Sequence, residues 1–225
     1  MLLADKNAQH IEPWLTGARF QWKGGFWGRR FEQLHTITLP SMRDSISHEG
    51  NAVFLGNFRR AAGLEWGPFS GKNWGDGDAY KYTEALTYAY ALTGSPCIES
   101  ELDELIDLIS KAQDHDGYIS TQTQLTGKAR WSQKHLHELY NMGHLMTAAV
   151  AHTRVTEKRS YLDIAVRAAD YLYGLFMPES GELIHMGFNP SQIMGLVDLY
   201  RQTGDTRYKD LAHRFIENRG ADPDL

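Results

Sequence analysis

The fold is decided by YALTGSPCIESELDELIDLI (residues 90–109), a stretch that ends one helix, turns at a threonine and begins a second helix. The same order of features returns in HTRVTEKRSYLDIAVRAADYL (152–172) and in YRQTGDTRYKDLAHRFI (200–216). Repeated helical hairpins indicate either an open solenoid or a closed α/α toroid. The turn threonines, Thr93, Thr156 and Thr203, are 63 and then 47 residues apart, which is too uneven for tetratricopeptide or ankyrin arrays. We therefore predict an all-α chain made of hairpins of an (α/α)6 toroid.

Apolar spacing along the rest of the chain predicts about seven helices after a short extended arm at residues 1–27. A long loop rich in glycine and tryptophan is expected at 63–78. Because a closed ring of six hairpins needs twelve helices, we expect residues 1–225 to be the N-terminal part of an incomplete ring. Its uncovered apolar faces would then need the missing C-terminal half of the domain, or a second copy of the chain. The helices are expected near residues 28–47, 79–93, 96–112, 133–154, 161–175, 191–202 and 208–215.

Composition excludes several classes of protein. The chain has 225 residues and a formal net charge of −5, and no run of Lys and Arg argues for a nucleic-acid surface. No apolar stretch approaches the ~20 residues that span a bilayer, and the N-terminus does not resemble a signal peptide. We therefore expect neither nucleic acid nor membrane as a partner, and a cytoplasmic and a periplasmic location both stay open. The single cysteine, Cys97, excludes an internal disulfide.

The candidate site begins in WSQKHLHELYNMGHLMTAAV, residues 131–150. His137, Asn141 and His144 follow one another at i, i+4 and i+7, which predicts one polar stripe on a helix. Imidazole and amide groups there suit a hydrogen-bonding pocket, although surface or satisfied core histidines would give the same pattern. Because His137 and His144 are separated by about 10 Å along a helix axis, they cannot share one metal ion. We expect no metal site on this helix.

Two other segments supply candidates. Asp76 and Asp78 precede the helix expected at 79–93, so they suit either N-capping or, beside Trp74, the binding of sugar hydroxyls. Asn189 precedes Pro190, a pairing that predicts an N-cap followed by a first-turn proline. His185 lies in the same loop and is a further candidate for substrate binding.

Several collinear segments resemble the β-L-arabinofuranosidase family of glycoside hydrolases, glycoside hydrolase family 127 and its relatives. They cover nearly the whole chain, and seven motifs in one order are more specific than any one of them. The segments are GGFWGRRFEQ (24–33), TITLP (36–40), GNFRRAAG (56–63), DGDAYKYTEA (76–85), QDHDGYIST (113–121), HELYNMGHLMTAAVAH (137–152) and LVDLYRQTGDTRYKDLA (196–212).

The resemblance implies a six-hairpin α/α catalytic domain that acts on furanosides of plant or glycoprotein glycans. In that family a cysteine is the nucleophile, a glutamate is the general acid/base, and zinc is held by a glutamate and three cysteines. These residues are expected downstream of residue 225, and Cys97 does not match them. His137 matches a family histidine that contacts the sugar. A family glutamine falls on Met42 and a second family histidine falls on Asn189, so two hydrogen-bonding partners that the family offers to its sugar are replaced in this sequence.

The resulting hypothesis is a retaining glycoside hydrolase that releases β-L-arabinofuranose or a related sugar. Under this hypothesis the isolated 225-residue chain is expected to be inactive. Two alternatives stay open. One is another α/α toroid enzyme, such as an unsaturated glucuronyl hydrolase or a sugar epimerase, and the other is a non-catalytic sugar-binding or truncated relative.

Overall fold

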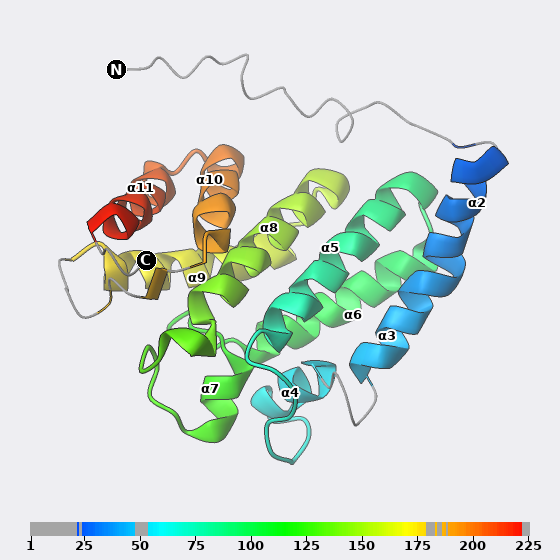
Figure 1. The fold of residues 1–225 in the computed structure, drawn as a ribbon. Helices are drawn as coiled ribbons and strands as arrows, with labels where there is room; N and C mark the ends of the chain where they lie inside the picture. Colours follow the sequence, from blue (N-terminus) through cyan, green and yellow to red (C-terminus); the bar gives the residue numbers. More distant parts are fainter. Residues whose placement is uncertain are drawn as a thin grey trace.

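The protein is all-α throughout the part of the chain that the computed structural model describes, which is residue 22 and residues 24–47, 54–178, 183, 186–187 and 189–221. No helix among these residues is both long and apolar enough to cross a membrane. The elements, shown in Figure 1, are α2 (Gly25–Gln33), the π-helical turn η2 (Leu34–Thr38), α3 (Leu39–Ser47), α4 (Phe54–Ala61), α5 (Gly75–Thr93), α6 (Pro96–Ala112), α7 (Thr121–Thr126), the 3-10 turn η3 (Lys134–Leu136), α8 (Glu138–Thr156), α9 (Ser160–Phe176), α10 (Ser191–Thr203) and α11 (Thr206–Ala221).

Three hairpins form two layers. The first layer holds α5, α8 and α10, with α8 packed between the other two. The second layer holds α6, α9 and α11, which pack against α5, α8 and α10 respectively. Figure 1 shows α6 and α9 behind α5 and α8. Because every hairpin goes from the first layer to the second and back, α5, α8 and α10 run in the same direction. This is the layered arrangement of an α/α toroid, as the repeats predict.

The three threonine turns are the corners of these hairpins, and they share one hydrogen-bond pattern. The Thr93 hydroxyl donates to the Ala89 carbonyl at 2.7 Å and accepts from the Ser95 N–H at 3.3 Å. Thr156 and Thr203 make the equivalent pairs of bonds at 2.8 and 3.2 Å. The residue after each threonine is left-handed, which ends the first helix and redirects the chain. These residues are Gly94 (φ 62°), Glu157 (φ 61°) and Gly204 (φ 75°).

Helices α8 and α10 approach each other closely because both have glycine at the contact. A Cβ at Gly143 would lie 2.3 Å from the carbonyl carbon of Ser191, and a Cβ at Gly195 would lie 2.5 Å from the Gly143 carbonyl oxygen. Backbone contact of this kind leaves no room for a side chain. It fixes the start of α10 against the first turns of α8.

The structure corrects several predicted boundaries. The segment predicted at 28–47 is helical from Gly25, so the last residues of the predicted arm belong to α2, while most of that arm lies outside the described residues. The turn η2 accommodates Pro40, which has no N–H to donate within the helix. Helix α5 begins at Gly75, inside the predicted 63–78 loop. The short helices α4 and α7 were not predicted.

Candidate functional site

The site lies where the N-terminal ends of α5, α8 and α10 meet. The side-chain oxygen of Asn141, on α8, accepts the Gly77 N–H of α5 at 2.9 Å, and its amide nitrogen donates to the Asn73 carbonyl at 3.0 Å. The Ser191 hydroxyl, at the start of α10, donates to the Tyr140 carbonyl at 3.1 Å. Asn141 is 1% exposed, so this predicted pocket residue joins two helices instead of facing a ligand.

His137 stands just outside α8 rather than on it. The chain passes through η3, and His137 then takes a left-handed conformation with φ 57° before α8 begins at Glu138. The prediction of a helix from 133, with His137 and His144 on one helical stripe, is therefore wrong. A left-handed residue redirects the chain, and it brings the His137 ring beside residues of both neighbouring hairpins.

The His137 ring contacts residues from the other two hairpins. The Trp74 ring lies edge-on to it with centroids 5.6 Å apart, and Asn189 Nδ2 is 3.4 Å from His137 Nδ1. Trp74 precedes α5 and is 42% exposed. Burial, followed by the nearby His135, lowers the pKa of His137, which favours the neutral ring. The Asn189 amide nitrogen can donate to Nδ1 when the neutral ring carries its proton on Nε2.

Asn189 does not have its predicted N-cap role. Pro190 occupies the N-cap position of α10, and no side chain of the described residues caps that helix. Asn189 is therefore a neighbour of His137 at the site. His185, the other candidate in this loop, lies outside the described residues.

A second group of polar residues continues from His137 along α5 and α8. The Tyr140 ring lies edge-on to His137 with centroids 5.7 Å apart, and edge-on to His144 at 4.6 Å. The Lys81 ammonium donates to the Tyr140 hydroxyl and, at 3.1 Å, to Asp78 Oδ1. Burial, together with the charge of Lys81, lowers the pKa of His144 to about 4, so this ring is neutral at pH 7. Lys81 and Tyr140 were not among the residues predicted for the site, although Asp78 and Lys81 have the i, i+3 spacing of one helix face.

Asp76 is placed differently from Asp78. It is 4% exposed, and its two carboxylate oxygens accept the backbone N–H (2.7 Å) and the hydroxyl (2.6 Å) of Thr121. Among the described residues no side-chain hydrogen bond caps α5, so the capping alternative holds for neither aspartate. Burial raises the pKa of Asp76 to about 6, against the lowering effect of the two bonds from Thr121. Asp76 thus anchors the segment that begins α7.

Glu138 fixes the loop that leads into His137. It is 3% exposed, and its carboxylate accepts from the Tyr118 hydroxyl and from the Trp131 N–H at 3.0 and 3.1 Å. Burial raises the pKa of Glu138. Trp131 has φ 59°, a strained conformation for a large residue, and the carboxylate holds its N–H in place. The loop 131–137 is therefore fixed at both ends.

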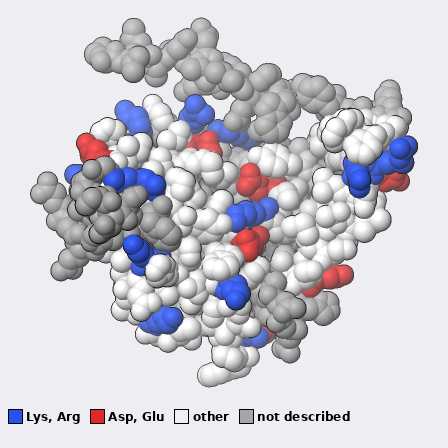
Figure 2. Space-filling model, in the orientation of Figure 1, with Lys and Arg blue, Asp and Glu red and all other residues white. Residues whose placement is uncertain are grey.

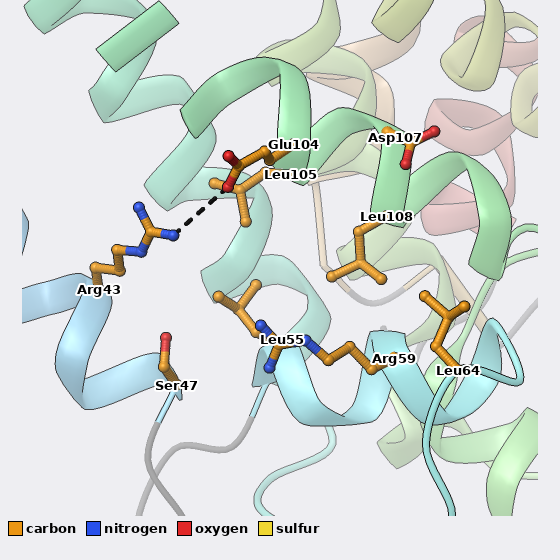
Figure 3. A pocket seen from close by; sticks show the side chains of 9 residues that line it. All are labelled: Arg43, Ser47, Leu55, Arg59, Leu64, Glu104, Leu105, Asp107 and Leu108. Carbon is orange, nitrogen blue, oxygen red and sulfur yellow. Dashed lines mark ion pairs between the residues drawn. The ribbon is translucent and has the colours of Figure 1, made fainter. Parts of the chain in front are cut away.

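Two grooves lie elsewhere. Figure 3 shows one of about 210 Å³ between α3, α4 and α6, where the Arg43 guanidinium pairs with Glu104 at 3.7 Å. The other, about 450 Å³, lies along α11. Neither includes a predicted site residue.

Met42 lies on α3 with 39% of its surface exposed. Among the described residues, no three His, Cys, Asp or Glu side chains are grouped to hold a metal ion.

Comparisons with known proteins point to one family. The family model described as β-L-arabinofuranosidase, GH127 catalytic domain, matches residues 20–225. A non-reducing end β-L-arabinofuranosidase of Bifidobacterium longum subsp. longum is 34% identical over 210 residues, which cover 88% of this chain and 31% of that protein. Similarity to solved structures is equally extensive along this chain.

A GH127 β-L-arabinofuranosidase from Geobacillus stearothermophilus T6 superposes with a TM-score of 0.80 and 31% identity, over 90% of this chain and 33% of that one. A second GH127 β-arabinofuranosidase gives a TM-score of 0.74 and 28% identity, over 91% and 34%. The chain therefore spans about a third of the length of these relatives.

Proposed function

Because this chain belongs to the GH127 β-L-arabinofuranosidase family, we propose that the protein containing it is a retaining glycoside hydrolase. Its proposed reaction is the release of β-L-arabinofuranose or a related sugar from plant or glycoprotein glycans. The proposed activity is the one for which the relatives are named. The site around His137 is where residues 1–225 would contribute to it.

The observation that supports this proposal is the convergence of Trp74, His137 and Asn189 from three different hairpins. An exposed indole beside a neutral imidazole suits a sugar, because the indole packs against C–H groups and the imidazole exchanges hydrogen bonds with hydroxyls. Contacts with Trp74 and Asn189 hold the His137 ring in this position. Asn189 stands where the family resemblance places a histidine, so a polar side chain is kept beside His137 at this position. The residues Trp74, His137 and Asn189 are called the sugar-binding wall below.

Bond cleavage is proposed to come from residues outside 1–225. The zinc site implied by the family needs three cysteines, and this sequence contains one. Cys97 is exposed and lies in the first turn of α6, a helix of the second layer. The residues present do not fit that metal site.

The rest of the ring is the proposed partner of the apolar side chains exposed on α2, η2 and α3. Large side chains of this kind, exposed together along one continuous helix, indicate a surface that another segment covers. They are Phe26 (55% exposed), Trp27 (66%), Leu34 (43%), Ile37 (58%) and Met42 (39%).

The first experiment measures hydrolysis of an aryl β-L-arabinofuranoside by the natural polypeptide that contains residues 1–225, and by residues 1–225 alone. We expect turnover by the former, and none by the latter. Turnover by residues 1–225 alone, in the Cys97→Ser variant as well, would contradict the placement of the chemistry. Sugar binding without hydrolysis by the natural polypeptide would instead favour the non-catalytic alternative.

The second experiment tests whether His137, in the sugar-binding wall, contacts the sugar. His137→Gly is preferred to alanine because glycine adopts a positive φ without strain. We expect weaker binding of the sugar with little change in melting temperature, and no change in either quantity for His115→Ala in an exposed turn. A fall of many degrees with unaltered affinity would show that His137 is a structural residue.

A further inference from the structure

The polar group that follows His137 along α5 and α8 lies on the face of the first layer. In Figure 2, basic and acidic groups stand side by side in the middle of this face, over α5 and α8. The Lys81 side chain is 38% exposed and that of Asp78 is 36% exposed. Both charged groups are therefore accessible although they pair with each other. Helices α5, α8 and α10 pack against one another much more extensively than α6, α9 and α11 do. In a ring of hairpins the more tightly packed layer is the inner one, so this face belongs to the inner wall.

The described residues do not use up the hydrogen-bonding capacity of this pair. An ammonium has three N–H donors, and among the described residues those of Lys81 reach Asp78 Oδ1 and the Tyr140 hydroxyl. These residues leave one donor over, and an ionised carboxylate accepts several bonds. A donor and an acceptor thus stand next to each other, which is the pattern that two neighbouring hydroxyls of a sugar require.

Tyr140 links this pair to the rest of the site. The Lys81 ammonium lies 4.9 Å from the centre of the Tyr140 ring as well as bonding to its hydroxyl, and the same ring contacts His137 and His144. These contacts hold Lys81 on the wall near His137. A flexible lysine loses conformational entropy when a ligand fixes its side chain. A lysine whose side chain is already held in place loses less.

The charges at this position balance. Lys81 and Asp78 are opposite in sign, and the neutral His144 adds no charge at pH 7. A carboxylate ligand would meet the Asp78 carboxylate as well as the Lys81 ammonium, and like charges repel. A neutral ligand meets no such penalty.

We propose that Lys81 and Asp78 form a subsite that binds hydroxyl groups of a neutral sugar on the inner wall, with Tyr140 as the positioning residue. This inference rests on the proposed function, since it names further residues and the charge class of the substrate. It predicts that the protein prefers neutral glycosides to glycosides of uronic acids.

The experiment measures binding by calorimetry in the natural polypeptide that contains residues 1–225. The probes are methyl β-L-arabinofuranoside, its 2-, 3- and 5-deoxy analogues and methyl β-D-glucuronide. The variants are Lys81→Met, which keeps the length of the side chain without its charge, and Lys81→Arg, which keeps the charge and changes the donor geometry. Lys111→Met is the matched control, because Lys111 is also paired with an aspartate, Asp107, but on helix α6 of the second layer.

For Lys81→Met we expect binding of the arabinofuranoside to weaken about tenfold or more, as for a hydrogen bond to a charged group. The same substitution should change binding less than about twofold for the one deoxy analogue that lacks the bonded hydroxyl. Lys111→Met should bind as the unchanged protein does. If Lys81→Met does not fold, Lys81→Arg tested against the same analogues decides the question.

Unchanged affinity in the Lys81 variants, or tighter binding of the glucuronide, would overturn the subsite. If the unchanged protein hydrolyses arabinofuranosides in that case, the proposed function stands without it. If the unchanged protein neither binds nor hydrolyses these neutral furanosides, both the proposed function and the subsite are wrong.

Discussion

Asp76→Asn should remove a pH-dependent loss of stability from this protein. The carboxylate is buried and bonded to Thr121, and burial raises its pKa from the ordinary 3.8 to about 6. Asparagine has nearly the same shape. Its oxygen can accept the Thr121 N–H and its amide can donate to the Thr121 hydroxyl, so both contacts can persist without a charge.

The size and sign of the effect follow from the two pKa values. At about 1.36 kcal/mol per unit of pKa, the rise from 3.8 to about 6 corresponds to ~3 kcal/mol. Since the folded protein holds this proton more tightly than the unfolded chain, the contribution is fully present below pH 3.8 and is lost as the pH rises through about 6. The amide introduced by the substitution does not titrate. Between pH 4 and pH 7, the unchanged protein should lose about 2–3 kcal/mol of unfolding free energy relative to Asp76→Asn.

Urea unfolding, followed by circular dichroism at several pH values between 4 and 7.5, measures this difference. Asp107→Asn on α6 is the control, since Asp107 is 62% exposed and pairs with Lys111 at the surface. Its difference from the unchanged protein should vary by less than about 0.5 kcal/mol over the same range. If the free energies of the unchanged protein and of Asp76→Asn run parallel from pH 4 to pH 7.5, the reasoning from burial is refuted.

Two further substitutions test how the site is supported. Gly143→Ala places a Cβ 2.3 Å from the α10 backbone and should cost about 1–3 kcal/mol of unfolding free energy. Its control is Gly174→Ala, where the added Cβ meets nothing within 4 Å, and this substitution should be neutral or stabilising. Equal effects of the two substitutions in urea unfolding would contradict the close packing of α8 and α10. Glu138→Gln leaves Tyr118 and the Trp131 N–H with one acceptor oxygen and should cost about 1–3 kcal/mol. Glu104→Gln, whose side chain is 67% exposed, is its control, and a Glu138→Gln protein as stable as this control would show that the loop is held by other contacts.

The hairpins could be predicted from sequence because their signals are local. Each corner is a threonine followed by a residue in the left-handed conformation, and the threonine bonds reach no further than four residues along the chain. The apolar spacing on either side then gives the two helices. Helices α4 and α7 lack this support. With eight and six residues, they are too short for an apolar period to stand out from the surrounding loops.

The site was less predictable because it depends on contacts between distant segments. The prediction that His137 belongs to a polar helical stripe assumed helical backbone, and the left-handed φ of 57° breaks that assumption without any change in spacing. Tyr140 was not predicted as a site residue, yet its hydroxyl accepts from Lys81, which is 59 residues away. The partnership of Asn189 with His137 depends in the same way on the close approach of α8 and α10.

Asp76 and Asp78 show why such ambiguities persist. Acidic residues suit the first turn of a helix, where the unpaired N–H groups and the macrodipole favour negative charge. Sugar recognition calls for carboxylates at the same places, since the N-terminal ends of parallel inner helices meet at one end of the ring. Sequence spacing cannot distinguish a carboxylate that stabilises a helix start from one that binds sugar. The burial of each side chain in the structure does distinguish them. Asp76 is enclosed and bonded to Thr121, and Asp78, two residues later, is on the open face beside Lys81. If the ring wall binds sugar, the exposed member of the pair is the one whose substitution must alter affinity.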